Sequence, residues 1–307
     1  MSSAADHVCV LGLGGVGGSL AVRLARAGIE VICVARPQAV VTLTAAGLSL
    51  FDDEESYTAH PCFTDHLSEP VDLLLVAVKA AELEVALERI DPDAVANGVV
   101  LPLLNGLEHM VVLRRRFGKR VAAGSTSVIA CKEAPGKIVQ ESSFTIVRMA
   151  SDDLERDELE RAAELLQRAG VDVRVVDSEL DVLWGKAVRM GPLAAVTAAS
   201  GMTLGEILAD SAWRRRLDAA LKESYATATA AGMPMDFAEQ WGWVEALPGS
   251  FTSSTARDAA AGRRSEIDAI AGSIVREGAR LGVSTPALAA LVAEVEAITA
   301  ANSKKED

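Results

Sequence analysis

The sequence is poor in aromatic residues, histidine and cysteine. Aromatic residues make up 4% of its 307 residues, and it has four histidines and four cysteines. The cysteines show neither a Cys-x-x-Cys pair nor a Cys/His ligand spacing, which argues against a metal site and a disulfide framework. They are Cys9, Cys33, Cys62 and Cys131. Cys9 and Cys33 fall in predicted strands and are interpreted as small core residues, and a reduced cytoplasmic setting fits this cysteine usage.

Positive charge and long apolar runs are also scarce. Thirty Lys and Arg residues stand against 43 Asp and Glu, so the net charge is −13. An anionic chain is poorly suited to nucleic acid or to an anionic membrane, and neither is expected as a partner. The apolar runs are short and lie beside turns, which predicts buried strands and no membrane span. The start, MSSAADH, has no basic region followed by an apolar core, so we expect no export signal and a cytoplasmic protein.

The length suits two domains, and the pattern changes near residue 180. Up to that point, strand and helix patterns alternate, which predicts an α/β domain with a doubly wound parallel sheet. The predicted strands are Val8–Leu11, Val31–Ala35, Leu73–Val78, Val99–Leu101 and Val121–Ile129, then Lys137–Gln140, Phe144–Met149 and Val171–Val176. The predicted helices are Val16–Ala27, Pro37–Ala46, Leu83–Arg89, Glu108–Phe117 and Leu154–Arg168.

From Asp181 onward the strand signals vanish and Ala/Leu-rich helical patterns take over. The predicted helices here are Asp181–Ser200, Leu204–Ala209, Ala212–Ala231, Phe237–Ala246, Ile267–Leu281 and Pro286–Ile298, followed by a polar tail at Asn302–Asp307. We therefore predict two domains: residues 1–178, which bind a nucleotide, and residues 179–307, an all-helical domain with catalytic and substrate groups. The Ala-rich helical half could offer the surface of a homodimer.

A glycine-rich turn joins the first predicted strand to the first helix. Its sequence is Gly12-Leu13-Gly14-Gly15-Val16-Gly17. A G-x-G-x-x-G motif that follows a strand, opens a helix and reaches a second strand is the dinucleotide-binding fingerprint of a Rossmann-type fold. The first glycine permits the tight turn, the second lets a pyrophosphate approach the backbone, and the third lets the helix pack closely. All six residues are predicted to bind the cofactor, with its pyrophosphate at the helix N-terminus.

The second strand ends in Ala35-Arg36-Pro37, where an NAD site usually has an acidic residue. A carboxylate there would repel a 2′-phosphate, whereas a guanidinium binds it through paired, charged hydrogen bonds. The alternative for Arg36 is a solvated surface residue. Its place at the end of the strand favours NADPH/NADP+ over NAD(H).

Several motifs, taken in order, extend this interpretation over essentially the whole chain. They are the glycine turn, Ala35-Arg36, Val78-Lys79-Ala80, Asn105-Gly106, Leu183-Trp184-Gly185-Lys186, Ser253-Ser254, Arg264-Ser265-Glu266-Ile267-Asp268 and Gly282-Val283-Ser284-Thr285-Pro286. Together they resemble the ketopantoate reductase (2-dehydropantoate 2-reductase) family. The resemblance implies reduction of a 2-oxo acid to its (R)-2-hydroxy acid with NADPH.

Such a reaction needs a donor to the developing alkoxide and a group that holds the carboxylate. Lys186 lies in an otherwise apolar helix, where an unpaired ammonium is costly, and it matches the catalytic lysine of the family. Glu266 matches the family's second key acid and would pair with Lys186 or hold the substrate hydroxyl. The structural alternatives are a lysine at a domain edge and a carboxylate stabilised at a helix start.

Three further positions are matched through the resemblance. Ser254 corresponds to a serine near the substrate carboxylate, although a capping hydroxyl is the alternative. Lys79 ends a predicted strand at the carboxyl edge of the sheet and is placed near the nicotinamide ribose. Asn105 would bind the cofactor ribose or the substrate, although Asn-Gly is also a common turn. His109 is interpreted as a first-turn helix residue and not as a catalytic base.

The chain departs from the family pattern where the substrate is expected. Asparagines usual in the family are replaced by Met190 and Ala194, one and two turns after Lys186, and by Phe251. Residues spaced by four share one helix face. The predicted pocket is thus more apolar than one built for a polar dihydroxy chain, and a bulkier aromatic or branched 2-oxo acid is favoured. Gly191-Pro192 could instead disturb the helix and shift the alignment, and Arg189 could supply a carboxylate contact.

Two other functions stay open. One is NADPH-dependent reduction of another ketone or of an imine with the same lysine. The other is a noncatalytic protein that senses NADP(H), against which the presence of both Lys186 and Glu266 argues.

Overall fold

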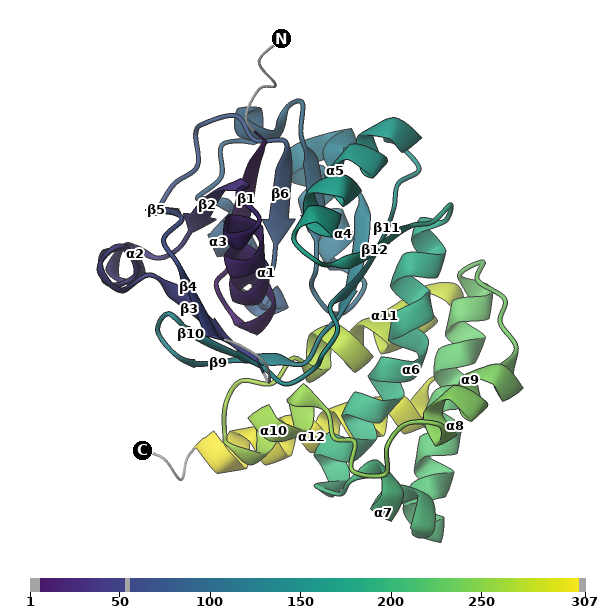
Figure 1. Cartoon of the computed structure of the whole chain (residues 1–307). Coiled ribbons are helices and arrows are strands. Elements are labelled where there is room, and N and C mark those ends of the chain that lie inside the picture. Colours follow the sequence, from purple (N-terminus) through teal and green to yellow (C-terminus); the bar gives the residue numbers. More distant parts are fainter. Residues whose placement is uncertain (1–5, 53–55, 304–307) are drawn as a thin grey trace. The chain divides into compact units, whose positions relative to one another are not determined.

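The computed structural model describes residues 6–52 and 56–303, and within it the chain forms two compact units (Figure 1). The first unit runs to Leu104 and resumes over His109–Val182. The second unit takes Asn105–Glu108 and the described chain from Leu183 onward. A four-residue segment of the nucleotide-binding half of the sequence is therefore part of the helical unit.

The first unit contains a five-stranded parallel sheet in the order β5-β2-β1-β6-β7. Its strands are β1 (His7–Leu11), β2 (Glu30–Val34), β5 (Cys62–Thr64), β6 (Leu73–Val76) and β7 (Val99–Pro102). Val10 of the central strand lies opposite Cys33 on one side and Leu75 on the other. This order confirms the predicted Rossmann-type doubly wound sheet, with β1 at the point where the winding direction changes.

Helices cover both faces of this sheet, with α1 and α5 drawn in front of it and α3 and α4 behind it (Figure 1). The helices of this unit are α1 (Gly15–Arg26), α2 (Pro37–Ala46), α3 (Leu83–Leu87), α4 (His109–Phe117) and α5 (Arg156–Arg168), with short 3₁₀ turns η1 (Ala80–Glu82), η2 (Pro92–Val95) and η3 (Gly118–Arg120). A capping box fixes the start of α5, because the side chains of Glu155 and Glu158 each accept from the other's backbone N–H.

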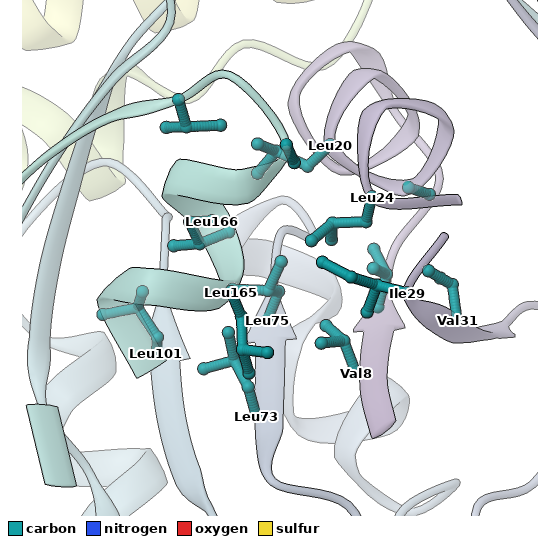
Figure 2. Close-up of a cluster of buried hydrophobic side chains, with 14 of the residues drawn as sticks. Val8, Leu20, Leu24, Ile29, Val31, Leu73, Leu75, Leu101, Leu165 and Leu166 are labelled. Carbon is teal, nitrogen blue, oxygen red and sulfur yellow. The ribbon is translucent and has the colours of Figure 1, made fainter. Parts of the chain in front are cut away.

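The core of this unit lies between the sheet and its front helices. Figure 2 shows Val8, Leu73 and Leu75 of the sheet facing Leu24 of α1 and Leu165 of α5. All of these side chains are buried. Cys9 and Cys33 are also fully buried in the sheet, which confirms them as core residues, and burial raises the pKa of the Cys9 thiol.

Two further sheets were not foreseen as such. One has the order β4-β3-β10-β9 and comprises β3 (Leu48–Phe51), β4 (Ser56–Ala59), β9 (Ala130–Ala134) and β10 (Lys137–Gln140). The prediction missed β3, β4, β5 and β9, because these strands are short and partly exposed and carry no continuous apolar run. This second sheet packs on α1, so that helix lies between two sheets.

The predicted strand Val121–Ile129 does not continue the parallel sheet. Its ordered part, β8 (Ala123–Ser127), pairs antiparallel with β11 (Ile146–Ala150), which in turn pairs parallel with β12 (Asp172–Val175). One parallel bridge between Val100 and Val121 joins β7 to this third sheet. β8 and β11 run in opposite directions and are not joined by a crossover helix. The alternation of strands and helices alone does not predict this arrangement.

The second unit is helical, as predicted. Its elements are α6 (Glu179–Ser200), α7 (Leu204–Ala209), α8 (Ser211–Ala230), α9 (Phe237–Glu245), α10 (Ser254–Ala260), the π-helical turn η4 (Asp268–Gly272), α11 (Ser273–Leu281) and α12 (Pro286–Ser303). The prediction missed α10 and gave η4 and α11 as one regular helix. The predicted polar tail begins inside α12, and residues 304–307 lie outside the described residues.

None of the helices described in the two units has both the length and the apolar character of a membrane span. Within the same residues, no group of three or more His, Cys, Asp or Glu side chains is arranged to hold a metal ion.

Candidate active site

The glycine turn connects β1 to α1 at the carboxyl edge of the parallel sheet. Gly12 has a φ of +100°, a conformation that other residues rarely adopt, and a Cβ there would lie 2.7 Å from Val78 Cγ1. A Cβ on Gly17 would overlap the carbonyl oxygen of Gly12. The space around Gly14, the residue that precedes α1, is open to 4 Å. Two glycines therefore allow close packing, and the third leaves room beside the helix N-terminus, which fits a bound pyrophosphate.

The remaining residues of the turn have different surroundings. A Cβ on Gly15 would overlap the carbonyl oxygen of Ala130 in β9, so this glycine lets α1 approach the second sheet. Leu13 and Val16 are partly buried and pack against the core of the first unit. Sequence reasoning attributed all six residues to cofactor binding, but packing alone accounts for the absence of a side chain at Gly15.

Arg36 lies two residues after the end of β2 and precedes α2, whose first residue is Pro37. Its side chain is 69% exposed, and its Nη2 atom lies 3.0 Å from Oε1 of Glu82 in η1. Lys79 precedes the same 3₁₀ turn, three residues after β6, and is exposed. Both cations thus follow the carboxyl ends of parallel strands, where doubly wound sheets bind their ligands.

In the second unit, Lys186 of α6 interacts with two other predicted site residues. Lys186 Nζ donates a hydrogen bond of 2.9 Å to Asn105 Oδ1. Burial lowers the pKa of Lys186 to about 8, and the nearby Glu266 carboxylate opposes part of this shift. Lys186 therefore interacts with two other predicted site residues that are far from it in the sequence, Asn105 and Glu266.

The backbone around these residues explains their meeting. Gly106 has a φ of +91°, and a Cβ there would overlap the carbonyl oxygen of Ala269 in η4. Glu266 lies at a bend two residues before η4, and its carbonyl accepts from Ile270 N–H at 2.9 Å. The Asn105 turn and the Glu266 bend thus pack on the same π-helical turn. Such turns are rare and are frequent at functional sites.

Helix α6 is continuous across Pro192, which confirms the predicted helix Asp181–Ser200, and the alternative of a disturbance at Gly191-Pro192 does not occur. A Cβ on Gly191 would lie 2.5 Å from Ile274 Cδ1, which shows that this glycine allows α6 to approach α11. Lys186, Met190 and Ala194 therefore follow one another at intervals of four on a regular helix. Met190 is partly buried and Ala194 is buried in the core of the unit.

The two adjacent serines have different roles. Ser253 is buried and caps α10: its Oγ accepts from Ala256 N–H at 3.0 Å and lies 2.8 Å from Thr197 Oγ1 of α6. Ser254 is the first residue of α10 and is exposed. The helix-capping alternative for Ser254 was therefore wrong, because its neighbour caps the helix. Phe251, three residues earlier, is partly buried against the helical core.

Arg189 and His109 lie close in the sequence to Lys186 and Asn105, and the structure shows what surrounds each of them. Arg189 places its guanidinium 4.2 Å from the ring centre of Trp243 in α9 and donates to Gly185 O at 2.6 Å. Sequence reasoning missed this stacking partner, since 54 residues separate the two positions. His109 is the first residue of α4, as predicted, and is 4% exposed. Burial lowers its pKa to about 4, so the ring is neutral near pH 7.

Comparisons with known proteins give a consistent result. The family model "Ketopantoate reductase PanE/ApbA" matches residues 8–150, and "Ketopantoate reductase PanE/ApbA C terminal" matches residues 180–299. The chain is similar to the 2-dehydropantoate 2-reductase of Caulobacter vibrioides, with 30% identity over 301 residues that cover 94% of this chain and 98% of that protein. It is also similar to the 2-dehydropantoate 2-reductase of Archaeoglobus fulgidus, with 26% identity over 91% of this chain and 92% of that protein.

Solved structures show the same fold. A PanE/ApbA family ketopantoate reductase from Ralstonia eutropha has 30% identity and a TM-score of 0.86, with 97% of this chain and 99% of that chain covered. A D-mandelate dehydrogenase, in a ternary structure with NADH and anilino(oxo)acetate, has 22% identity, the same TM-score and the same coverage. With both halves matched, the chain belongs to the ketopantoate reductase PanE/ApbA family, whose members are NADP-dependent oxidoreductases that act on a ketone or an alcohol.

Proposed function

We propose that this protein reduces a 2-oxo acid to its (R)-2-hydroxy acid with NADPH, and that Lys186 is the proton donor. The observation that carries the proposal is the hydrogen bond of 2.9 Å from Lys186 Nζ to Asn105 Oδ1, made by an ammonium whose pKa burial lowers to about 8. A lysine with this pKa is still protonated at neutral pH and releases its proton more readily than a solvated one.

The residues of the second unit divide the work as follows. NADPH, when bound, supplies the hydride to the carbonyl carbon. The Lys186 ammonium donates a hydrogen bond to the carbonyl oxygen and transfers a proton to it as negative charge develops there. The Asn105 amide oxygen holds the ammonium in position, and the Glu266 carboxylate favours its charged form. Ser254 is proposed to contact the substrate carboxylate.

The residues of the first unit fit NADP(H). The open space at Gly14 admits a pyrophosphate to the start of α1. The Arg36 guanidinium is exposed and pairs with Glu82, so a 2′-phosphate would replace a carboxylate on an available fork of donors. Lys79 is proposed to bind near the nicotinamide ribose, with Asn105 as a second contact to the ribose or the substrate.

The substrate is proposed to be bulkier and more apolar than ketopantoate. Met190 and Ala194 follow Lys186 on one regular helix, and neither side chain can recognise a hydroxyl group through hydrogen bonds. Phe251 replaces the third amide. A site that lacks such donors and acceptors does not strongly prefer hydroxylated substrates over substrates without a hydroxyl group. An aromatic or branched 2-oxo acid fits this composition, with Arg189 beside Trp243 as an additional cation.

Steady-state kinetics test this proposal. We expect kcat/KM with NADPH to be higher for phenylglyoxylate and branched 2-oxo acids than for ketopantoate. The variant Met190→Asn, at a position that is only partly buried, should shift the ratio back towards ketopantoate. A strong preference of the wild type for ketopantoate would contradict the substrate assignment while leaving the reaction class intact.

The second candidate is reduction of another ketone or an imine by the same lysine. It is favoured if NADPH is consumed with simple ketones or imines but not with 2-oxo acids. A noncatalytic NADP(H)-binding protein is favoured if NADPH binds and no carbonyl compound is turned over. The cytoplasmic location and the homodimer predicted from the sequence stay predictions.

A further inference from the structure

The segment Asn105–Glu108 makes two contacts with the helical unit besides the Lys186–Asn105 hydrogen bond and the packing of Leu107. The first is Gly106, which has no side chain and packs its backbone on the carbonyl of Ala269 in η4. The second is Glu108, whose carboxylate meets the guanidinium of Arg276 in α11. These four residues therefore belong to the second unit, although the chain on both sides of them belongs to the first.

Arg276 makes an unusually complete set of bonds for an exposed arginine. Its Nε donates to Glu108 Oε1 at 2.7 Å and its Nη2 to Glu108 Oε2 at 2.8 Å, which is a two-pronged pair. Its Nη1 donates to Asp268 Oδ1 at 2.5 Å and its Nη2 to the Asp268 carbonyl at 3.0 Å. The two carboxylates raise the pKa of Arg276 above its already high usual value. One side chain thus ties the Asn105 segment to η4.

Glu108 and Asp268, the two residues that Arg276 bonds, lie close in the sequence to the proposed catalytic groups. Glu108 is three residues after Asn105, which accepts the hydrogen bond from Lys186. Asp268 is two residues after Glu266, whose charge acts on Lys186. Arg276 therefore bonds the same two backbone segments that carry Asn105 and Glu266, the partners of Lys186.

We propose that Arg276, through Glu108 and Asp268, is a positioning residue that holds Asn105 and Glu266 in place around Lys186. The proposal rests on the proposed function of Lys186 as proton donor. Arg276 touches no reacting atom and acts through the two segments it joins. Small displacements of catalytic groups lower rates strongly, because the reacting geometry is lost before the fold is.

An exposed ion pair by itself contributes little to stability, and Arg276 is about half exposed. Its two-pronged geometry and its two carboxylate partners make this contribution measurable, but exposure to solvent keeps it modest. The expected consequence of breaking it is therefore small in stability and larger in catalysis, and this difference separates a positioning role from a structural one.

The experiment compares Glu108→Gln, Arg276→Gln and Arg276→Lys with the wild type, each alone and combined with Asn105→Ala. Arg280→Gln is the matched control, because Arg280 lies one turn further along α11 and pairs with Glu277 on the same helix. The measurements are kcat, KM for NADPH, the melting temperature and the pH at which kcat falls on the alkaline side.

We expect Glu108→Gln and Arg276→Gln to lower kcat about 5- to 30-fold, in line with a coupling of 1–2 kcal/mol between neighbouring residues, at nearly unchanged NADPH KM. Arg276→Lys should recover part of this loss. A misplaced Asn105 amide stabilises the ammonium less, so the alkaline limb of kcat should move to lower pH. In the Asn105→Ala background Glu108→Gln should add little, since the residue it positions is gone, whereas Arg276→Gln should keep the part of its effect that acts through Asp268 and Glu266.

Two results would overturn the proposal. One is full additivity of Glu108→Gln with Asn105→Ala, and the other is an unchanged alkaline limb with a loss of activity that follows the melting temperature. If Lys186→Ala keeps full activity, the proposed function fails first. If Lys186→Ala is inactive while Glu108→Gln matches both the wild type and Arg280→Gln, only the role of Arg276 fails.

Discussion

The glycine turn of the first unit and the cluster formed by Asn105, Lys186 and Glu266 in the second unit are built in opposite ways. The turn uses backbone and missing side chains: Gly12 and Gly17 are required by close approach, and Gly14 leaves open space. The cluster uses side chains from three segments far apart in the sequence, Asn105, Lys186 and Glu266. A contiguous motif therefore indicates where a cofactor binds, whereas the proposed reaction depends on contacts that only the fold brings together.

The largest expected effect is in the second unit. Lys186→Ala removes the proton donor and should lower kcat by about 10²- to 10⁴-fold, the usual contribution of general acid catalysis. NADPH affinity should change little, because the glycine turn is intact. Stopped-flow turnover and fluorescence titration measure the two quantities. Lys222→Ala is the control, since Lys222 is an exposed lysine paired with Asp218 on α8. Equal losses of turnover and NADPH affinity would show that the two regions are not separable in this way.

The next effect is in the first unit and concerns cofactor choice. Arg36→Asp should weaken NADPH binding about 10- to 150-fold, because it removes charged hydrogen bonds of roughly 1.5–3 kcal/mol and adds repulsion. NADH binding should be unchanged or improved. Dissociation constants for both cofactors check this, with Arg174→Asp as a control at another exposed arginine. If both cofactors respond alike, Arg36 does not bind the 2′-phosphate.

The glycines of the turn separate packing from binding. Gly17→Ala should destabilise the protein by about 1–3 kcal/mol, because the new methyl group overlaps the Gly12 carbonyl oxygen. Gly14→Ala should leave the melting temperature nearly unchanged, since its surroundings are open, but should weaken cofactor binding. Gly242→Ala in α9, also in open space, should be neutral or stabilising. A stable Gly17→Ala variant would refute the packing assigned to this glycine.

The smallest effect follows from pH. Because the pKa of Lys186 is about 8, the ammonium is protonated at pH 7, and kcat for reduction should fall about tenfold per pH unit well above pH 8. The unfolded state has the ordinary, higher lysine pKa, so it binds more protons between the two values. The Lys186 contribution to stability therefore rises with pH across that window. A kcat that is flat to pH 10 would contradict a protonated Lys186 as donor.

Prediction from the sequence succeeded where local pattern determines structure. The parallel sheet was predicted from its apolar strands, such as Leu73–Val76, and α7 was predicted at its observed bounds. It failed where tertiary packing decides. Strands such as β9, with Lys132 and Glu133, have no apolar pattern and form because they pair with β10 and cover α1. Helix α10 was missed, and which of the adjacent serines caps it could not be read from the sequence, because Ser253 and Ser254 differ only in their surroundings.

The candidate site was also predicted only in part from the sequence. Lys186, Glu266 and Asn105 were predicted as site residues through a resemblance, whereas the hydrogen bond from Lys186 to Asn105 and the effect of Glu266 on the pKa of Lys186 come from the fold. Arg276 and Trp243 gave no signal, because their importance comes from partners 168 and 54 positions away. The predicted helix Asp181–Ser200 is confirmed as α6 through Gly191 and Pro192, but the sequence does not show that Ile274 packs against Gly191.

The measurement that tests the central claim most directly is NADPH consumption by the wild-type protein with a panel of aromatic, branched and hydroxylated 2-oxo acids. The account predicts that NADPH is oxidised with at least one of them and that one (R)-2-hydroxy acid forms for each NADPH consumed. Binding of NADPH with no consumption in the presence of any 2-oxo acid would contradict it.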